Sequence, residues 1–309
     1  MNTLVIFTGG TIASSLNDGY LSPSVKGSKE IIELYKKSFP KEARDVDFST
    51  LSPFTILSEN LDGDYLNQII DTVKQIDISK YDGIILAHGT DTLQYTAAAL
   101  SLVFSDIKIP LIMVSSNYIL SDARANGLDN FRAAVNYIKC KERVGVYVAY
   151  CNEKSENSQC IFPAGALLPH QPYSDALSSI NESIENATYE LIISSNELFD
   201  FKSVKLSKNS NVLYLQATPG MSYPLEALHM YKAILISTYH SGTLNTSSED
   251  LGLFCEAAQK LDIPVYIVGT TSQLAYESTK VFEDLGIKKL PEISPILAYM
   301  YLWFTFCFA

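Results

Sequence analysis

Short apolar runs alternate with polar turns and amphipathic stretches along most of the chain. The run at 4–7 ends in Thr8-Gly9-Gly10-Thr11, and the run at 83–87 ends in His88-Gly89-Thr90-Asp91-Thr92. Continuous apolar runs of this length are typical of strands buried on both faces of a parallel sheet. Further strands are expected at 46–56, 110–115, 144–149, 212–215, 233–237 and 265–268, with helices at 28–39, at about 62–75 and from about 93. This alternation predicts an α/β fold with a mainly parallel, doubly wound sheet.

A polar stretch, residues 181–210, separates two such patterns. We therefore expect a larger N-terminal catalytic domain at 1–190, a linker at 191–210 and a smaller C-terminal α/β domain at 211–309. The tail at 296–309 is strongly apolar but shorter than the roughly 18 residues that a membrane-spanning helix needs. It predicts a buried final helix.

Charge and cysteine content exclude several classes of function. The net charge of −11 and the pI near 4.8 argue against binding to nucleic acid or to anionic membranes. The five cysteines are an odd number without metal-site spacing, so free thiols in a reducing cytoplasm are expected, with no metal. No basic segment precedes the first apolar run, so no secretory signal is expected.

The candidate chemistry lies in the turns that follow the first two apolar runs. Gly9 and Gly10 leave backbone N–H groups unshielded, and Thr11 places a hydroxyl beside them, which is the arrangement that acyl transfer needs. A purely structural threonine is the alternative. Asp91 and the threonines beside it stand at an expected helix start, where capping is the alternative. The polar stretch 14–28 is expected to be a loop that acts as a lid and carries Tyr20.

Five stretches together resemble the bacterial-type L-asparaginase family. Thr8–Ala13 and His88–Thr92 carry the resemblance most specifically, and 121–130, 239–243 and 271–273 extend it over nearly the whole chain. The resemblance implies two α/β domains and hydrolysis of L-asparagine to L-aspartate and ammonia. It also implies homodimers or homotetramers with the active site at a subunit interface, and no metal or organic cofactor.

The resemblance assigns four residues to catalysis. Thr11 is the expected nucleophile, and Tyr20 of the lid is expected to assist it. Thr90 and Asp91 match a pair that helps proton transfer and binds the amino group. A neutral hydroxyl must lose a proton as it attacks, and the amide nitrogen must gain one before it leaves, so such a relay suits the chemistry.

Four further residues are assigned to substrate binding: Gly10, Ser58, Glu59 and Gly89. Ser58 and Glu59 match positions that hold the α-carboxylate and α-amino groups of the substrate. Carboxylates at Glu59 and Asp91 suit an ammonium group.

This chain lacks one residue that the resemblance leads us to expect. The family carries a lysine after the fourth strand, paired with the second-motif threonine and aspartate, but residues 161–171 contain none. His170 is a possible substitute because histidine titrates near neutrality, and an ordinary loop histidine is the alternative. Glu277 is a possible contributor to the site of a neighbouring subunit.

Three functions remain open from the sequence. The first is asparagine hydrolysis, the second is an amidase for another amide such as glutamine, and the third is a catalytically weakened homologue that binds acidic amino acids. A transfer-RNA amidotransferase component is disfavoured, because the first catalytic strand opens the chain and the negative charge suits RNA poorly.

Overall fold

The computed structural model describes residues 1–17, 20–23, 25–140, 143–152, 160–180, 199–271 and 276–307. The chain forms two compact units, Met1–Ser179 and Ile180–Ala309. The domain and linker boundaries predicted at 190 and 210 stay predictions, and residues 181–198 lie outside the described part.

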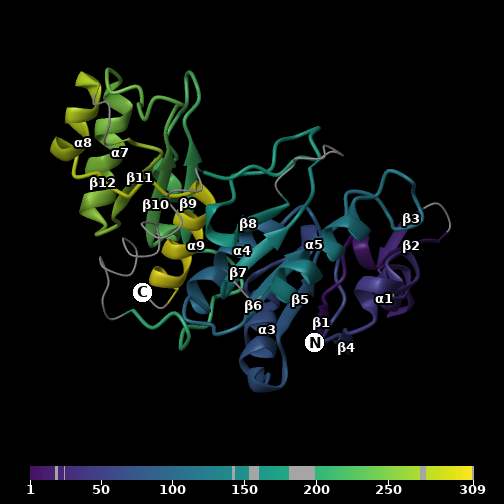
Figure 1. Ribbon diagram of the computed structural model, residues 1–309. Coiled ribbons are helices and arrows are strands. Elements are labelled where there is room, and N and C mark those ends of the chain that lie inside the picture. The colour runs from purple at the N-terminus through teal and green to yellow at the C-terminus, as the bar shows by residue number, and fades with distance from the viewer. Residues whose placement is uncertain are drawn as a thin grey trace. The chain divides into compact units, whose positions relative to one another are not determined.

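The N-terminal unit is built on a six-stranded sheet with the order β4-β1-β5-β6-β7-β8 (Figure 1). Its strands are β1 (Asn2–Phe7), β4 (Asp47–Leu51), β5 (Gly83–Ala87), β6 (Pro110–Val114), β7 (Gly145–Ala149) and β8 (Ile161–Pro163). Five strands run parallel, and the edge strand β8 pairs antiparallel with β7. The mainly parallel α/β sheet predicted from the apolar runs is confirmed.

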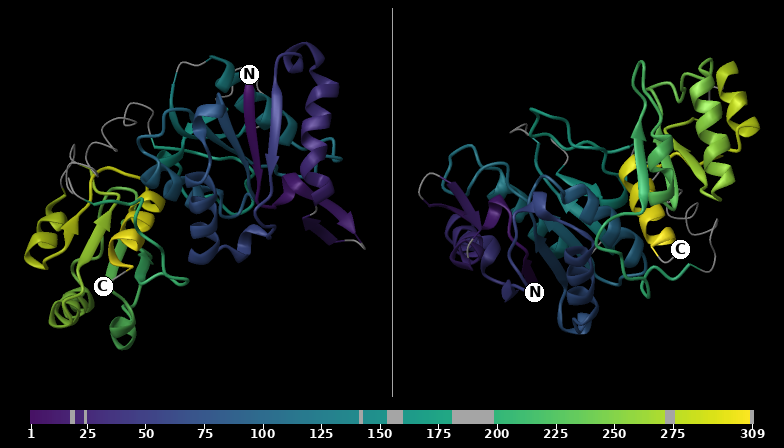
Figure 2. Two further views of the ribbon diagram at one scale, coloured as in Figure 1. Left: turned by 90° about the horizontal axis from the view of Figure 1, so that it is seen from below. Right: turned by 180° about the vertical axis from the view of Figure 1, so that it is seen from behind.

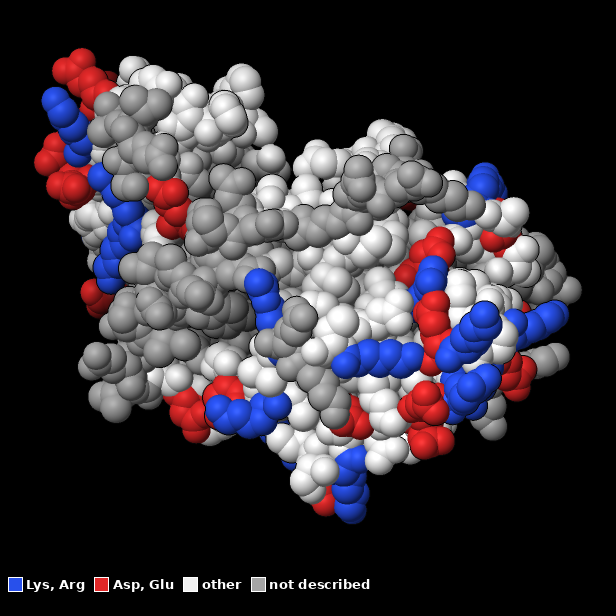
Figure 3. All heavy atoms as spheres, viewed as in Figure 1, with Lys and Arg blue, Asp and Glu red and all other residues white. Residues whose placement is uncertain are grey.

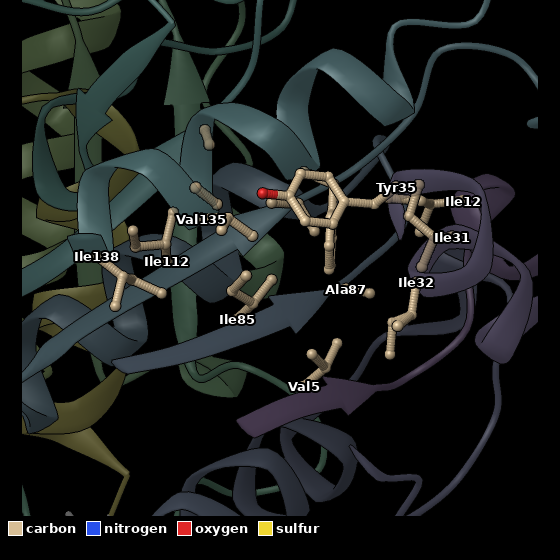
Figure 4. Close-up of a cluster of buried hydrophobic side chains, with 14 of the residues drawn as sticks. Val5, Ile12, Ile31, Ile32, Tyr35, Ile85, Ala87, Ile112, Val135 and Ile138 are labelled. Atoms are coloured by element: carbon tan, nitrogen blue, oxygen red, sulfur yellow. The ribbon is translucent and has the colours of Figure 1, made fainter. Parts of the chain in front are cut away.

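Helices cover both faces of this sheet. One face packs against α1 (Val25–Ser38) and α5 (Gly127–Cys140), and Figure 4 shows side chains from both helices meeting alternate residues of β1, β5 and β6. The intervening strand residues point to the opposite face, where α4 (Leu93–Val103) packs on β7 and α3 (Gly63–Lys74) packs on α4. Because both faces are covered, the central strands are apolar throughout.

The stretch predicted as a lid loop contains regular structure instead. Residues Ser14–Asn17 (β2) and Tyr20–Pro23 (β3) form an antiparallel hairpin, and α1 begins at Val25 rather than at residue 28. The prediction of a loop was wrong because a high content of small polar residues masked a hairpin signal. Asp18-Gly19 is a dipeptide typical of two-residue hairpin turns, and Leu16 and Leu21 flank it.

The C-terminal unit has its own four-stranded parallel sheet with the order β12-β11-β10-β9 (Figure 2). Its strands are β9 (Val212–Gln216), β10 (Ala233–Ser237), β11 (Val265–Val268) and β12 (Lys288–Lys289), and its helices are α7 (Glu249–Lys260), α8 (Val281–Asp284) and α9 (Pro295–Phe306). Helix α9 packs on β9 and β10, which confirms the buried final helix. Among the described residues, no helix has both the length and the apolar character needed to cross a membrane.

Short elements connect this framework. They are α2 (Pro40–Ala43) and the 3₁₀ turns η1 (Thr11–Ala13), η2 (Ser58–Asn60), η3 (Ile78–Lys80), η4 (Ala164–Ala166), η6 (Leu225–Met230) and η7 (Glu277–Lys280).

Two of the five cysteines are joined. Cys151 and Cys160 form a disulfide, whereas Cys140, Cys255 and Cys307 are free. The expectation that all five are thiols was wrong, because the hairpin of β7 and β8 returns the chain beside itself. The amide of Tyr150 donates to the carbonyl of Cys160 at 2.8 Å, and this pairing places the two sulfur atoms within bonding distance.

Candidate active site

The turn after β1 is fixed by backbone hydrogen bonds to two neighbouring segments. The amide of Thr8 donates to the carbonyl of Ala87 (3.1 Å). The amide of Ile56 donates to the carbonyl of Thr8 (3.0 Å), and the amide of Gly10 donates back to the carbonyl of Ile56 (3.3 Å). Thr11 follows immediately as the first residue of η1. The predicted nucleophile therefore stands at the carboxyl end of a central strand, where α/β sheets bind ligands.

Three glycines allow the loops to approach as closely as they do. A Cβ atom on Gly10 would lie 2.3 Å from the Cα atom of Gly89, and one on Gly89 would lie 2.4 Å from the Oγ atom of Ser58. Gly9 and Gly10 also have φ values of 112° and 77°, which side chains disfavour. The loops that follow β1, β4 and β5 consequently meet backbone to backbone.

Hydrogen bonds join the second and third of these loops. The hydroxyl of Ser58 donates to Oδ2 of Asp91 at 3.3 Å, and the hydroxyl of Thr92 donates to the carbonyl of Ser58 at 2.9 Å. Ser58 is buried, Thr11 and Thr90 are half-buried, and Asp91 is exposed. The structure thus gathers the candidate residues around a place that solvent can reach.

The start of α4 does not use these polar side chains as caps. Thr92 occupies the N-cap position without a side-chain cap hydrogen bond, and its hydroxyl binds Ser58 instead. The Asp91 carboxylate accepts from Ser58, which leaves it facing the meeting point of the loops. Capping therefore does not account for the polar cluster at this helix start.

His88 lies beneath the surface next to Gly89 and is buried, with 1% of its surface exposed. Its Nδ1 atom donates to the carbonyl of Gly89 at 2.8 Å, because a carbonyl can only accept. Its Nε2 atom then accepts from the hydroxyl of Thr96 at 3.0 Å. Burial lowers the pKa of His88 from 6.5 to about 4, so the ring is neutral at pH 7 and holds the Gly89 turn in place.

The segment where the family lysine is expected packs against α4 through η4. Leu167 is buried, and Leu168 is half-buried with its amide donating to the carbonyl of Ser178 at 2.9 Å. His170 is half-buried, and its Nε2 atom has no hydrogen-bond partner among the described residues. The predicted contact of His170 with the second motif stays a prediction.

Of the remaining candidates, Glu59 lies in the loop that carries Ser58, Glu277 lies in the other unit, and the Tyr20 side chain lies outside the described part. The Tyr20 side chain lies outside it, although the backbone of Tyr20 belongs to β3. Glu59 is exposed in η2 beside Ser58. Glu277 is exposed in η7 of the C-terminal unit.

Sequence reasoning missed three residues that shape the site. Ile56 forms an isolated parallel bridge with Gly9, Thr96 fixes the His88 ring, and the side-chain amide of Gln94 donates to the carbonyl of Asp91 at 3.3 Å. A signal existed only for Gln94 and Thr96, which are polar residues in a mostly apolar helix.

Comparison with known proteins identifies the family. The family model described as "Asparaginase, N-terminal" matches residues 2–197. The chain belongs to the asparaginase family. The curated relatives of this asparaginase-family chain include the D subunits of glutamyl-tRNA(Gln) amidotransferases. The protein from Sulfolobus acidocaldarius is 28% identical over 98% of this chain and 70% of its own length. The protein from Methanosphaera stadtmanae is 26% identical over 96% of this chain and 70% of its own length.

Solved structures show the same fold. The thermostable L-asparaginase from Thermococcus kodakarensis matches with a TM-score of 0.73 at 22% identity, covering 100% of this chain and 94% of that one. A probable cytoplasmic L-asparaginase from Campylobacter jejuni gives a TM-score of 0.71 at 20% identity. The match covers 100% of this chain and 95% of that one. The predicted family and fold class are confirmed, and the low identities mark this chain as a divergent member.

Proposed function

We propose that this asparaginase-family chain hydrolyses the side-chain amide of an amino-acid substrate through Thr11 and releases ammonia. The observation that supports the proposal is the convergence of the three loops that follow β1, β4 and β5. The second and third loops carry Ser58, Thr90 and Asp91, and Gly89 of the third loop approaches Gly10, the residue before Thr11.

The proposed reaction has two steps. The Oγ atom of Thr11 attacks the carboxamide carbon, the Oγ–C bond forms and the C–N bond breaks. The hydroxyl proton passes through Thr90 and Asp91 to the departing nitrogen, which leaves as ammonia. Water then cleaves the ester, which yields the substrate carboxylate and restores the hydroxyl of Thr11. A positioned proton relay of this kind contributes roughly 10²–10⁴ in rate.

Charge supports an amino-acid substrate. Asp91 and Glu59 are exposed carboxylates on adjacent loops, and both suit a substrate ammonium. Tyr20 is proposed to assist Thr11 from the hairpin, and His170 is proposed to carry a proton in place of the family lysine. Gly10 and Gly89 are proposed to line the substrate pocket through their backbones.

A second candidate is the release of ammonia from glutamine within an amidotransferase. It is favoured by the glutamyl-tRNA(Gln) amidotransferase relatives, whose D subunits align with nearly the whole chain. The weakened homologue that binds acidic amino acids without turnover is the third candidate. The active assembly is proposed to be a homodimer or homotetramer in which Glu277 reaches a neighbouring site.

The cytoplasm is proposed as the location from the acidic charge and the three free thiols. The disulfide between Cys151 and Cys160 counts against it. Thiol alkylation of the protein in rapidly quenched cells distinguishes a reducing compartment from an oxidising one. In a reducing compartment Cys151 and Cys160 are both thiols and react with the reagent, whereas the disulfide does not react.

Ammonia release from asparagine and from glutamine tests the proposed function. Thr11→Ala is expected to fold and to lose at least about 100-fold in turnover, because the attacking oxygen is gone. Thr50→Ala is the matched control, since Thr50 is an exposed threonine on the edge strand β4. Thr8 cannot replace the nucleophile, because its buried hydroxyl donates to the carbonyl of Ala87 at 3.0 Å. Wild-type turnover in Thr11→Ala would refute the assignment.

A further inference from the structure

The disulfide between Cys151 and Cys160 lines a groove in the N-terminal unit. The groove has a volume of about 960 Å³, and its other walls come from the loop after β6, the start of α5 and an exposed rim at 173–176. Both cysteines are half-buried rather than enclosed in the core. A groove of this size admits a small organic molecule, so a thiol in solution can reach the sulfur atoms.

Hydrogen bonds connect Cys151 to the loop after β6. Its amide donates to Oδ1 of Asn130 at 2.6 Å, and its carbonyl accepts from Nδ2 of Asn126 at 3.1 Å. Nδ2 of Asn130, which is fully buried, donates to the carbonyl of Ser115 at 2.8 Å. If Cys151 moves away, a buried amide oxygen loses its donor, which is costly. The conformation of this loop therefore depends on the position of Cys151.

The same loop contacts the second motif of the candidate site. Ser115 follows Val114, whose carbonyl accepts from the amide of His88 at 2.9 Å. The ring of His88 binds the carbonyl of Gly89, the residue before the proposed relay pair. A short series of hydrogen bonds thus leads from the disulfide to the Gly89 turn.

Cys160 supplies a second connection to the site. It immediately precedes β8, which leads directly into η4, and η4 packs against α4. Helix α4 begins at Leu93, directly after the turn that carries Asp91. Both ends of the disulfide are therefore joined to segments that support the candidate site.

The charges nearby favour a small reductant over a charged protein. In the groove, Arg124 pairs with Asp122 at 2.7 Å, and Arg132 pairs with Glu42 at 2.5 Å. On the face shown in Figure 3, acidic and basic side chains are likewise interleaved over the N-terminal unit. Mixed charge of this kind gives little long-range steering to a charged partner, whereas a small thiol needs only to diffuse into the groove.

We propose that Cys151 and Cys160 form a reversible redox pair that low-molecular-weight thiols exchange in this groove. We further propose, on the basis of the function proposed above, that the bonded pair holds the candidate site in its active arrangement. A reversible pair also removes the conflict between this disulfide and the proposed cytoplasmic location, because disulfides of cytoplasmic proteins are usually transient, catalytic or redox-sensing.

The exchange takes two steps. The thiolate of one small molecule attacks one sulfur atom of the pair, the bond between the two cysteines breaks, and the other cysteine leaves as a thiolate that takes a proton from water. A second small thiol then displaces the first. The chain gains two thiols, and the two small molecules leave as their own disulfide, having supplied two electrons. The oxidised small molecule reverses both steps.

Equilibration of the native protein with glutathione, at defined ratios of its reduced and oxidised forms, tests the proposal. Alkylation and mass spectrometry count the thiols at 151 and 160, and ammonia release from asparagine and from glutamine is measured on the same samples. We expect the pair to open reversibly and kcat/KM to fall at least about fivefold as it opens, because small displacements of reacting groups are costly. Hydrogen exchange in peptides that cover 88–91 and 115–126 is expected to become faster in the reduced protein and to slow again after reoxidation.

Two variants assign the response to this pair. The double variant Cys151→Ser/Cys160→Ser is expected to have the turnover of the reduced wild type at every glutathione ratio. Cys140→Ser is the matched control, because it removes an exposed free cysteine of α5 in the same unit, and it is expected to keep the full response. If the double variant does not fold, the titration of the wild type still decides the proposal.

The outcomes separate the redox pair from the proposed function. Thiols that appear only after unfolding in urea overturn the redox pair, and so does a response that disappears in Cys140→Ser. A pair that opens without a change in turnover overturns its coupling to the site and leaves the proposed function standing. Failure to release ammonia from either compound in either state overturns the proposed function. The thiol counts and the hydrogen exchange then still decide the redox pair, and unchanged exchange overturns its coupling to the site.

Discussion

The buried neutral His88, which binds the Gly89 turn of the candidate site, makes the stability of the N-terminal unit depend on pH in a defined window. His88 has its pKa lowered from 6.5 to about 4 by burial. Because the pKa of His88 is lower in the folded chain than in the unfolded chain, the folded state has its full stability above pH 6.5 and loses stability as the pH falls toward 4. Between those values the unfolded chain binds a proton that the folded chain excludes.

The size of this effect follows from the two pKa values. At pH 7 the unfolded imidazole is mostly neutral, so His88 costs the folded state little. At pH 5 the unfolded imidazole is almost fully protonated and the folded one is mostly neutral. Integration between these two pH values gives a loss of about 2 kcal/mol in the free energy of unfolding from this one group.

The assay must report on the N-terminal unit. The single tryptophan, Trp303, lies in α9 of the C-terminal unit, so its fluorescence follows the other unit. Hydrogen exchange of peptides from β5, measured against urea at pH 7 and pH 5, gives the required free energy. His88→Gln is the reference, because glutamine retains polar atoms and does not titrate.

Wild type is expected to lose about 2 kcal/mol more than His88→Gln between pH 7 and pH 5, since the carboxylates of the unit are common to both proteins. Equal losses in the two proteins would refute the reasoning. If the variant does not fold, the ring signal of His88 in an NMR titration gives the same information. That signal should stay at its neutral position down to pH 5.

Three further predictions concern the loops around the site. Gly89→Ala is expected to lower ammonia release on the order of 100-fold, because its Cβ would lie 2.4 Å from a neighbouring side chain and push the loops apart. Leu168→Lys is expected to fold and to raise turnover in an ammonia assay, because Leu168 is only half-buried. Leu167→Lys is expected to unfold the N-terminal unit, as measured by hydrogen exchange, because it buries an unpaired ammonium group. Reduction of the bond between Cys151 and Cys160, or Cys151→Ser, is expected to lower the stability of the N-terminal unit by roughly 3 kcal/mol in urea titrations followed by hydrogen exchange.

The sequence predicted the central sheet well because its strands carry an unambiguous signal. The run at 83–87 has no polar side chain and the run at 233–237 has only Ser237 at its end, and the structure has strands at these same residues. The strand-end turns were also accessible from sequence, since glycines beside hydroxyl residues mark a place where backbone approaches backbone. What sequence could not supply was the pairing of distant segments, such as Ile56 with Gly9, because no local pattern records which loops meet.

The two errors have local physical causes. In the stretch 14–28, the many small polar residues favoured a loop, but residues 14–17 and 20–23 pair as an antiparallel hairpin. The disulfide arises because β8 runs antiparallel to β7, and only that strand direction returns Cys160 to Cys151. A sequence that predicts a parallel sheet gives no reason to expect one antiparallel edge.

The lack of a lysine in residues 161–171 changes the electrostatics of the proposed reaction as well as the set of residues that could carry it. A lysine paired with the second motif would compensate Asp91, but the hydrogen bond that Asp91 receives comes from the neutral hydroxyl of Ser58. An uncompensated carboxylate raises the cost of the negative charge that develops on the attacked carbonyl oxygen. A substrate ammonium bound at Asp91 supplies the missing positive charge at the same place. A substrate that brings this ammonium group is therefore the better partner for this site, and N-acetyl-asparagine, which lacks the group, is expected to release ammonia far more slowly than asparagine.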